Sequence, residues 1–288
     1  HRDLHSFPTR RSSDLTFNTL WKQVSDNLSI YKSYPKIVGE TGGKDFIFAH
    51  NSADPLELAT AIVRGAFEYQ GQKCSAASRA YIPQSIWELT KEHVLRMISE
   101  IRIGNVTDLN NFVNAVIDEP SFDRIMSYIK KAQESDKAEI IAGGKGDMSK
   151  GYFIEPTVII AKDPHFITME EEIFGPVMTI YVYEDDEYEE TLKLCDETSP
   201  YGLTGAIFSR DRYAMVKACR ILRYAAGNFY YNDKPTGAMV GQQPFGGSRA
   251  SGTNDKAGSH LNLLRWVSPR TVKETFIPAT DFRYPYMD

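Results

Sequence analysis

A cysteine among small and polar residues and a glutamate in a separate glycine-rich turn are the residues of this sequence best suited to chemistry. Cys74 stands in Gly-Gln-Lys-Cys-Ser at residues 71–75, and Glu40 in Gly-Glu-Thr-Gly-Gly-Lys at residues 39–44, 34 residues earlier (74 − 40). A thiolate can attack an electrophilic carbon, and a carboxylate can then activate water as a general base. A lone cysteine is more often a small core residue, but the pair predicts covalent catalysis.

Alternating helical and extended patterns must position these two residues. The helix expected from Pro55 to about residue 69 ends just before Cys74, which places the thiol near a helix boundary. Strands and helices of this length in alternation imply an α/β fold with a doubly wound, mainly parallel sheet. The strands are predicted at residues 36–38, 45–49, 79–82, 139–142, 152–160, 177–183, 203–209 and 227–231, and the other helices at 17–31, 86–98, 120–135, 188–195 and 211–223. Residues 265–277 alternate like an exposed strand.

The composition excludes several classes of protein. The chain of 288 residues has a net charge of −5 and no basic stripe, which argues against a nucleic-acid partner. No apolar run approaches the roughly 20 residues of a membrane helix, so no membrane association is expected. The three cysteines, Cys74, Cys195 and Cys219, are too few for a disulfide framework and lack metal-binding spacing. No metal site is predicted, and a reducing compartment is expected.

Two further motifs accompany the cysteine and the glutamate. Glu-Ile-Phe-Gly-Pro-Val occupies residues 172–177, and Pro-Phe-Gly-Gly-Ser at 244–248 is followed by Ser-Gly at 251–252. Taken singly, the first could be an acidic helix end before a Gly-Pro turn and the second a flexible glycine loop. In this order and at this spacing, the motifs across residues 39–252 resemble the aldehyde dehydrogenase superfamily.

The resemblance implies a role for each motif residue. Cys74 would be the nucleophile that forms a thiohemiacetal and then a thioester, and Glu40 the general base that releases the acid. Glu172 would hold the ribose of an NAD cofactor next to its nicotinamide, and Phe174 would pack near the nicotinamide. The Cys74 backbone N–H would stabilise the oxyanion together with an asparagine amide from a part of the superfamily fold that this sequence lacks.

The resemblance narrows to one branch of the superfamily. Residues 226–247, 251–256 and 265–270 are similar to the branch that oxidises glutamate γ-semialdehyde in proline catabolism. That substrate carries a zwitterionic amino-acid head far from its aldehyde. The resemblance implies that the head is held by the Ser75 hydroxyl and by backbone N–H groups at Gly237 and Ala238, with Phe245 walling the aliphatic stem. Some members have a serine at the position of Ala238, so one side-chain donor is absent here.

The resemblance also suggests how the chain is divided. Residues 1–15, rich in arginine and serine and without apolar periodicity, are outside it, and we interpret them as an assembly or cloning artefact rather than a transit peptide. Residues 16–39 would be a remnant of an NAD-binding domain and residues 40–254 the catalytic domain. Residues 255–288 would be an oligomerisation tail whose strand joins a partner subunit. The sequence is therefore interpreted as part of a longer enzyme, inactive alone.

Other functions remain open at this point. A different aldehyde dehydrogenase branch would share the mechanism and differ in substrate. A non-catalytic oligomerisation module would need neither the mechanism nor a substrate. A papain-like hydrolase would require a histidine to orient Cys74, and His50, His93, His165 and His260 stand in no catalytic context. By analogy with the superfamily branch, the expected location is the mitochondrial matrix in a eukaryote and the cytoplasm otherwise. The expected partners are a small-molecule substrate and further copies of the chain.

Overall fold

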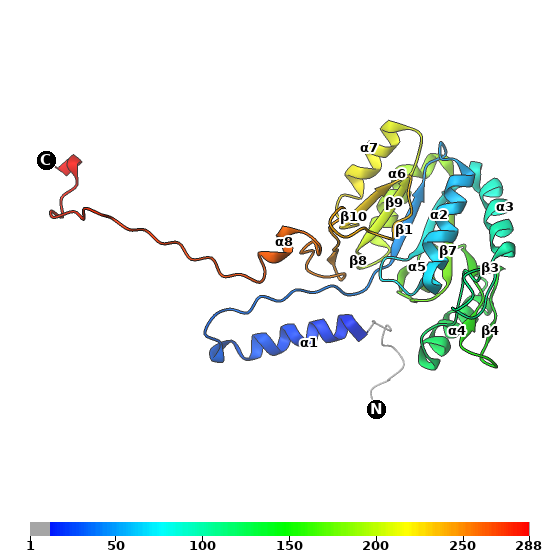
Figure 1. The fold of residues 1–288 in the computed structure, drawn as a ribbon. Coiled ribbons are helices and arrows are strands. Elements are labelled where there is room, and N and C mark those ends of the chain that lie inside the picture. The colour runs from blue at the N-terminus through cyan, green and yellow to red at the C-terminus, as the bar shows by residue number, and fades with distance from the viewer. Residues whose placement is uncertain (1–11, 288) are drawn as a thin grey trace, which may run out of the picture.

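A seven-stranded sheet forms the centre of the molecule, which a computed structural model describes over residues 12–287 (Figure 1). The strand order is β10-β9-β1-β2-β7-β6-β3, and all neighbours are parallel except β6 and β3. The predicted doubly wound, mainly parallel sheet is therefore confirmed. Its strands are β1 (Asp45–Ala49), β2 (Ala77–Pro83), β3 (Ala138–Ala142), β6 (Thr157–Ala161), β7 (Val177–Tyr183), β9 (Thr204–Phe208) and β10 (Asn228–Tyr231).

Helices cover both faces of this sheet, which explains why its central strands are buried throughout. In β1, Ile47 and Ala49 belong to the core on the side of α2 and α3, whereas Phe46 and Phe48 belong to the core on the side of α6 and α7. Successive side chains of a strand point to opposite faces, so a strand in this position has to be apolar on both. The helices are α2 (Pro55–Phe67), α3 (Gln84–Glu100), α4 (Glu119–Gln133), α5 (Ile167–Glu170), α6 (Tyr188–Glu197) and α7 (Arg212–Ile221).

Aspartate side chains define where three of these helices begin. Asp54 accepts hydrogen bonds from the backbone N–H groups at the start of α2, Asp118 does so for α4 and Asp211 for α7. An N-cap carboxylate satisfies backbone donors that have no partner within the helix. Proline at the first position adds to this signal in α2, and the predicted start at Pro55 is confirmed.

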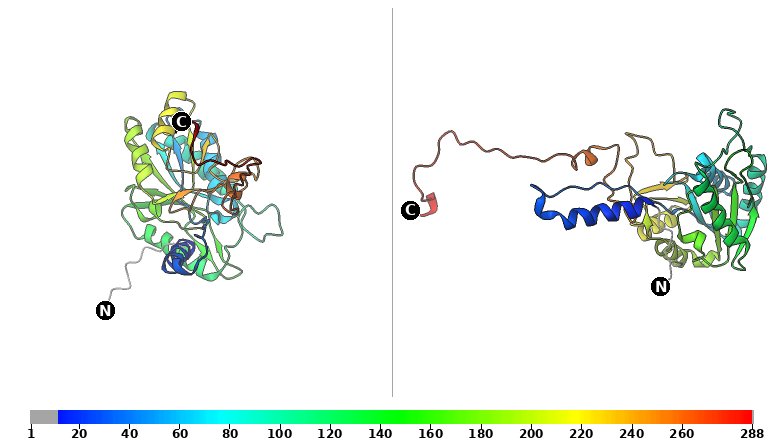
Figure 2. Two further views of the ribbon diagram at one scale, coloured as in Figure 1. Left: turned by 90° about the vertical axis from the view of Figure 1, so that its left-hand side faces the viewer. Right: turned by 90° about the horizontal axis from the view of Figure 1, so that it is seen from below.

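The first helix and the C-terminal tail extend away from the sheet in the same direction (Figures 1 and 2). Helix α1 (Ser12–Asp26) leads through the 3₁₀ turn η1 (Leu28–Ile30) into an extended segment. Lys36 Nζ donates to the Val267 carbonyl at 2.7 Å, and Arg265 Nη2 donates to the Ile37 carbonyl at 2.9 Å. These bonds hold the leading segment beside the tail, which contains α8 (His260–Leu263) and η4 (Pro285–Met287).

Two strand predictions are corrected by the structure. Residues 36–38 form no strand, because their polar contacts are side-chain bonds to and from the tail rather than a ladder. The strand expected at residues 152–160 is divided at Pro156, which cannot donate to a ladder, into β5 (Phe153–Ile154) and β6. Residues 265–277 pair with no strand of the described chain, so the prediction that this segment joins a sheet of a partner subunit stays a prediction. Two small ribbons complete the fold, β4 (Gly146–Asp147) with β5 and β8 (Tyr201–Gly202) with β11 (Ser248–Arg249).

Helix α1 already includes Ser12, the first described residue, five residues before the helix that the apolar pattern from Phe17 predicts. Asp14 is buried, and its carboxylate accepts hydrogen bonds from the Gly42 N–H at 3.2 Å and from the Tyr201 hydroxyl. The end of the segment interpreted as an artefact is therefore part of α1, while residues 1–11 lie outside the described residues. The apolar pattern could not indicate this part of the helix, because Asp14 is anchored by polar bonds.

Candidate active site

One open cavity of about 870 Å³ gathers most of the residues singled out from the sequence. Both proposed reacting groups, Cys74 and Glu40, contribute to its lining. So do the four residues expected to bind the substrate and one of the two expected to contact the cofactor. The lining residues are Ser13, Glu40, Thr41, Gln72, Lys73, Cys74, Ser75, Phe174, Thr236, Gly237, Ala238 and Phe245.

The segment that carries Cys74 has an unusual backbone. Helix α2 ends at Phe67, and the 3₁₀ turn η2 (Glu68–Gly71) follows with left-handed φ angles of 54° at Tyr69, 56° at Gln70 and 64° at Gly71. A Cβ atom at Gly71 would lie 2.3 Å from the Gly175 carbonyl oxygen, so this position has to be glycine. The turn after α2 thus brings Cys74 against the segment that carries Phe174.

The turn that carries Glu40 is fastened to the glycine loop near residue 252. The Thr41 N–H donates to the Ser251 carbonyl at 3.1 Å, and the Gly39 N–H donates to Thr253 Oγ1 at 3.0 Å. The loop therefore positions the carboxylate of Glu40, which remains exposed at the surface of the cavity. Partial burial raises the pKa of Glu40 above the ordinary value, which makes its carboxylate a stronger base.

The two reactive segments touch each other through their backbones. A Cβ atom at Gly43 would lie 2.2 Å from the Cys74 carbonyl oxygen. No other residue could allow this approach, because real Cβ atoms do not come so close to a backbone oxygen. The double glycine after Glu40 therefore sets the separation between the two reactive segments.

The residues expected to bind the substrate come from two further places around the cavity. Ser75 Oγ lies 2.8 Å from Thr236 Oγ1, and both side chains are buried. Gly237 and Ala238 follow directly, and Phe245 is held by paired backbone bonds with Ala257 of 2.9 and 2.7 Å. Thr236 has no role assigned from the sequence, yet it is the direct partner of Ser75.

The two residues expected to contact a cofactor occupy different depths. Phe174 lines the cavity with a left-handed φ of 57°. Glu172 is only 8% exposed, and its Oε1 accepts a hydrogen bond from the Gly43 N–H at 3.0 Å. The carboxylate of Glu172 thus lies behind the turn of Glu40 and is oriented by that turn.

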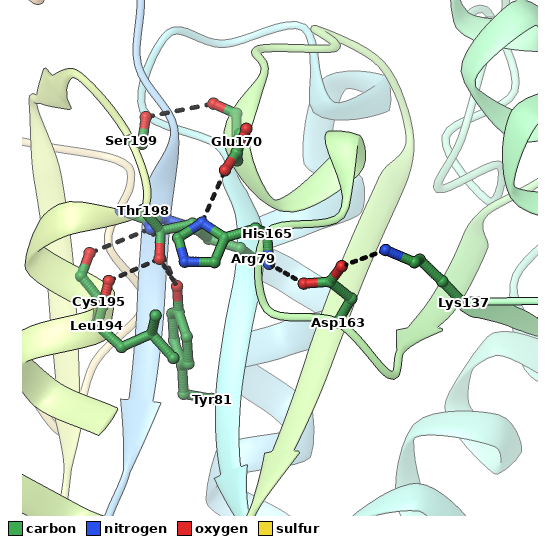
Figure 3. A network of polar contacts seen from close by, with 10 residues as sticks. All are labelled: Arg79, Tyr81, Lys137, Asp163, His165, Glu170, Leu194, Cys195, Thr198 and Ser199. Carbon is green, nitrogen blue, oxygen red and sulfur yellow. Dashed lines mark hydrogen bonds and ion pairs between the residues drawn. The ribbon is translucent and has the colours of Figure 1, made fainter. Parts of the chain in front are cut away.

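A buried arginine joins the nucleophile strand to the base turn. Arg79 Nε donates to the Lys44 carbonyl at 2.9 Å. Its Nη1 donates to the Cys195 carbonyl and to Tyr81 Oη, each at 3.1 Å (Figure 3). The Tyr81 hydroxyl continues the network by donating to Thr198 Oγ1 at 3.1 Å. Since Arg79 lies in β2, these bonds fix the strand after Cys74 against the turn before β1.

Two ionisable side chains at the start of β1 lie beneath this turn. Burial lowers the pKa of Lys44 to about 7, with a further lowering by Arg79. Burial also raises the pKa of Asp45 to about 8, against the bonds from the Thr204 hydroxyl and N–H, both at 2.8 Å. Both shifts are in the direction that favours the neutral forms of these two side chains.

Three of the four motif segments enter the sheet at the same edge. Glu40 precedes β1, Cys74 precedes β2 and Phe174 precedes β7, and these strands are parallel to one another. The cavity therefore lies at the amino ends of the strands. The cavity is also lined by Lys73, Gln72 and Thr41, to which the sequence analysis assigns no role. Their positions next to Cys74 and Glu40 could have indicated that they lie in the site.

The architecture and this site define the class of the protein. Residues 20–272 match the aldehyde dehydrogenase family, and the chain belongs to that family. Among curated relatives, the mitochondrial delta-1-pyrroline-5-carboxylate dehydrogenase of Dictyostelium discoideum is 61% identical over 98% of this chain and 52% of its own length. The human mitochondrial enzyme of the same name is 52% identical over 94% of this chain and 48% of its own length.

Solved structures give the same result. The delta-pyrroline-5-carboxylate dehydrogenase of Mycobacterium tuberculosis bound with NAD matches with a TM-score of 0.88 and 51% identity, over 96% of this chain and 50% of its own. The Thermus enzyme with bound NAD has a TM-score of 0.79 and 35% identity, over 88% of this chain and 47% of its own. The chain spans about half the length of the relatives it matches.

No helix within residues 12–287 has both the length and the apolar character needed to span a membrane. Within the same range, no group of three or more His, Cys, Asp and Glu side chains is arranged to hold a metal ion.

Proposed function

We propose that the protein containing this chain oxidises L-glutamate γ-semialdehyde, which arises from 1-pyrroline-5-carboxylate in proline catabolism, to L-glutamate with NAD. The observation that carries this proposal is the convergence of Cys74, Glu40 and the residues expected to bind the amino-acid head on one cavity. The relatives named above support the choice of branch.

In this mechanism Cys74 and Glu40 act in turn. The Cys74 sulfur forms a bond to the aldehyde carbon, and the backbone N–H of Cys74 helps to stabilise the oxygen that becomes negative. After oxidation the acyl group remains on the sulfur as a thioester. Glu40 takes a proton from water, the water oxygen attacks the thioester carbon, and the thiolate leaves. The backbone contact at Gly43 keeps base and nucleophile at a working separation.

The residues on this chain fit the nicotinamide end of NAD, which supplies the hydride acceptor when it is bound. The Phe174 ring lines the same cavity as Cys74, so it can form a wall for a flat ring beside the sulfur. The Gly43 N–H orients the carboxylate of Glu172, which can accept hydrogen bonds from ribose hydroxyls. We assign Glu172 and Phe174 to cofactor binding on this basis.

The substrate head would be bound opposite Cys74. Backbone N–H groups at Gly237 and Ala238 and the hydroxyl of Ser75 can donate to a carboxylate, and the Phe245 ring can cover the aliphatic stem. The apolar Ala238 side chain leaves the backbone donors unchanged.

Replacing Ser75 by alanine is expected to raise the KM for glutamate γ-semialdehyde about tenfold, because one hydrogen bond to the carboxylate is lost. The KM for propanal, which has no carboxylate, should change less than twofold. Initial-rate kinetics of a full-length protein that contains this chain measure both. Ser78→Ala makes the same change three residues later, in β2, and should leave both constants unaltered. Equal effects on the two aldehydes would contradict the anchoring role.

The direct test of the proposed function is NADH formation by a full-length protein that contains this chain. Glutamate γ-semialdehyde is compared with succinate semialdehyde and acetaldehyde at matched concentrations. A preference of at least about a hundredfold in kcat/KM for the first substrate is expected, since a carboxylate and an ammonium group both need partners. Activity mainly on the other two aldehydes would instead assign the protein to another branch of the family.

We also propose the division of the chain given above, with residues 16–39 in a cofactor-binding domain and residues 40–254 in the catalytic domain. Residues 255–288 would be a tail that joins a second copy of the chain. Large apolar side chains of this tail, including Trp266, Val272 and Phe276, are between 69% and 88% exposed, which supports a role in association. The names of the Dictyostelium and human relatives support a mitochondrial location in a eukaryote.

A further inference from the structure

A single carboxylate at the end of α2 joins two loops that both contribute residues to the lining of the cavity. Glu68 Oε2 accepts a hydrogen bond from Lys73 Nζ at 3.1 Å and another from Lys234 Nζ at 2.9 Å. Lys73 immediately precedes Cys74, and Lys234 lies just before the segment that contains Gly237 and Ala238. Glu68 thus connects the nucleophile loop (residues 71–75) to the substrate loop (residues 234–238).

A second connection between the same loops lies deeper. Ser75 Oγ and Thr236 Oγ1 are 2.8 Å apart and buried, whereas Lys234 Nζ also donates to the Thr236 carbonyl at 3.4 Å. The two loops are therefore fastened at two points, one ionic and one through hydroxyl groups. Two points of attachment fix the orientation of the substrate loop as well as its distance from Cys74.

The ion pairs of Glu68 with Lys73 and Lys234 are partly shielded from solvent, which strengthens them relative to fully exposed pairs. The side chains of Lys234, Glu68 and Lys73 are 18%, 22% and 29% exposed, in contrast with 60% for Arg64, which approaches the other carboxylate oxygen at 3.5 Å. Partial burial acts to raise the pKa of Glu68, but the bonds from Lys234 and Lys73 outweigh it and hold the pKa below the ordinary value. Glu68 is thus ionised at neutral pH and offsets the mutual repulsion of two ammonium groups.

We propose that Glu68 is a positioning residue that sets the distance between the nucleophile loop and the substrate loop. It thereby determines the apparent affinity for aldehydes that carry a carboxylate at the far end. This inference rests on the proposed function, because only a substrate held at both ends is sensitive to that distance. Glu68 itself is not among the residues that line the cavity, so its effect passes through the two loops.

The test is the kinetics of Glu68→Gln in a full-length protein that contains this chain. The amide keeps the size of the side chain but leaves Lys73 and Lys234 without a counter-charge. The KM for glutamate γ-semialdehyde should rise about tenfold, since a displaced anchor weakens a bound substrate. The kcat for glutamate γ-semialdehyde and the kcat and KM for propanal should each change less than twofold. The rate at which iodoacetamide modifies Cys74 should also change less than twofold. A general structural defect would alter all of these quantities.

Three further variants make the result specific. Arg64→Gln removes the exposed partner of the same carboxylate without touching either loop and should have no effect on KM. Thr236→Val removes the second connection while keeping a branched side chain, and should also raise the KM for glutamate γ-semialdehyde alone. Glu68→Asp retains the charge and should recover part of the affinity. Thr236→Val carries the test if Glu68→Gln does not fold.

The outcomes separate this inference from the proposed function. A wild-type protein without preference for glutamate γ-semialdehyde overturns both. A selective wild-type protein whose Glu68→Gln and Thr236→Val variants remain equally selective overturns only the role of the connections. A lower KM in Glu68→Gln would also overturn it, because it would mean that the lysines act on the substrate directly and that Glu68 restrains them.

Discussion

Replacing Cys74 by alanine in a full-length protein that contains this chain is expected to lower the rate of aldehyde oxidation about 10⁴-fold or more. Without the sulfur no covalent adduct forms, and neither the hydride-transfer step nor the hydrolysis that Glu40 promotes can proceed. Binding of NAD should be retained, because the assigned cofactor residues are Glu172 and Phe174. The measurements are steady-state NADH formation and the fluorescence change on titration with NAD.

The other two cysteines provide matched controls for Cys74. Cys219 is exposed on α7, and Cys195 is fully buried on α6, where burial raises its pKa to about 12. Cys219→Ala should therefore leave the rate within twofold of wild type. Peptide mapping after brief treatment with iodoacetamide should detect modification of Cys74 and none of Cys195. If the Cys74→Ala variant kept a tenth of the wild-type activity, the hypothesis of covalent catalysis at Cys74 would be wrong.

Replacing Glu40 by glutamine is expected to leave one rapid turnover and then stop. The first steps need only Cys74 and the bound cofactor, so a burst of NADH close to one per active site should appear. Hydrolysis of the thioester needs a base, and its loss should lower the steady-state rate by 10²- to 10⁴-fold. Stopped-flow absorbance separates the burst from the steady state. Glu139→Gln, the same change at an exposed position on the edge strand β3, should behave as wild type.

The pH dependence provides a second measurement for Glu40. A general base works in its ionised form, so the rate of thioester hydrolysis should fall as the pH drops below the pKa of Glu40. Because partial burial raises that pKa, the fall should begin at a higher pH than for an ordinary glutamate. The acid limb should disappear in Glu40→Gln. A wild-type profile that stays flat down to the range of an unperturbed carboxylate would argue that another group is the base.

Much of the fold could be predicted because its strands carry local signals. Both ends of β7 (Val177–Tyr183) are predicted correctly, because a run of β-branched and aromatic residues follows a Gly-Pro turn. The strand predicted at residues 36–38 is wrong because three residues carry no periodicity, and the bonds made there come from residues more than 200 positions away. The helical conformation of residues 12–16 could not be predicted for a similar reason, because Asp14 is anchored by Gly42 and Tyr201.

The site divides in the same way. Cys74 and Glu40 could be singled out from the sequence because each stands in a short motif, and the glycines after Glu40 mark close backbone approaches such as that of Gly43 to Cys74. The bond between Ser75 and Thr236 joins residues 161 positions apart and leaves no local pattern. Contacts of this kind depend on how the loops are placed by the sheet, and only the folded chain reveals them.

Because the cavity lies at the amino ends of the strands, it faces the carboxyl end of the α2 dipole. In a β-α-β unit the helix runs opposite to its strands, so α2 directs its carboxyl end, and the partial negative charge of its macrodipole, toward the amino ends of β1 and β2. An anionic ligand arriving at this edge gains no attraction from α2 and has to be held by individual loop donors. Cations are favoured at the same place, and Lys73 and Lys234 gather there around Glu68.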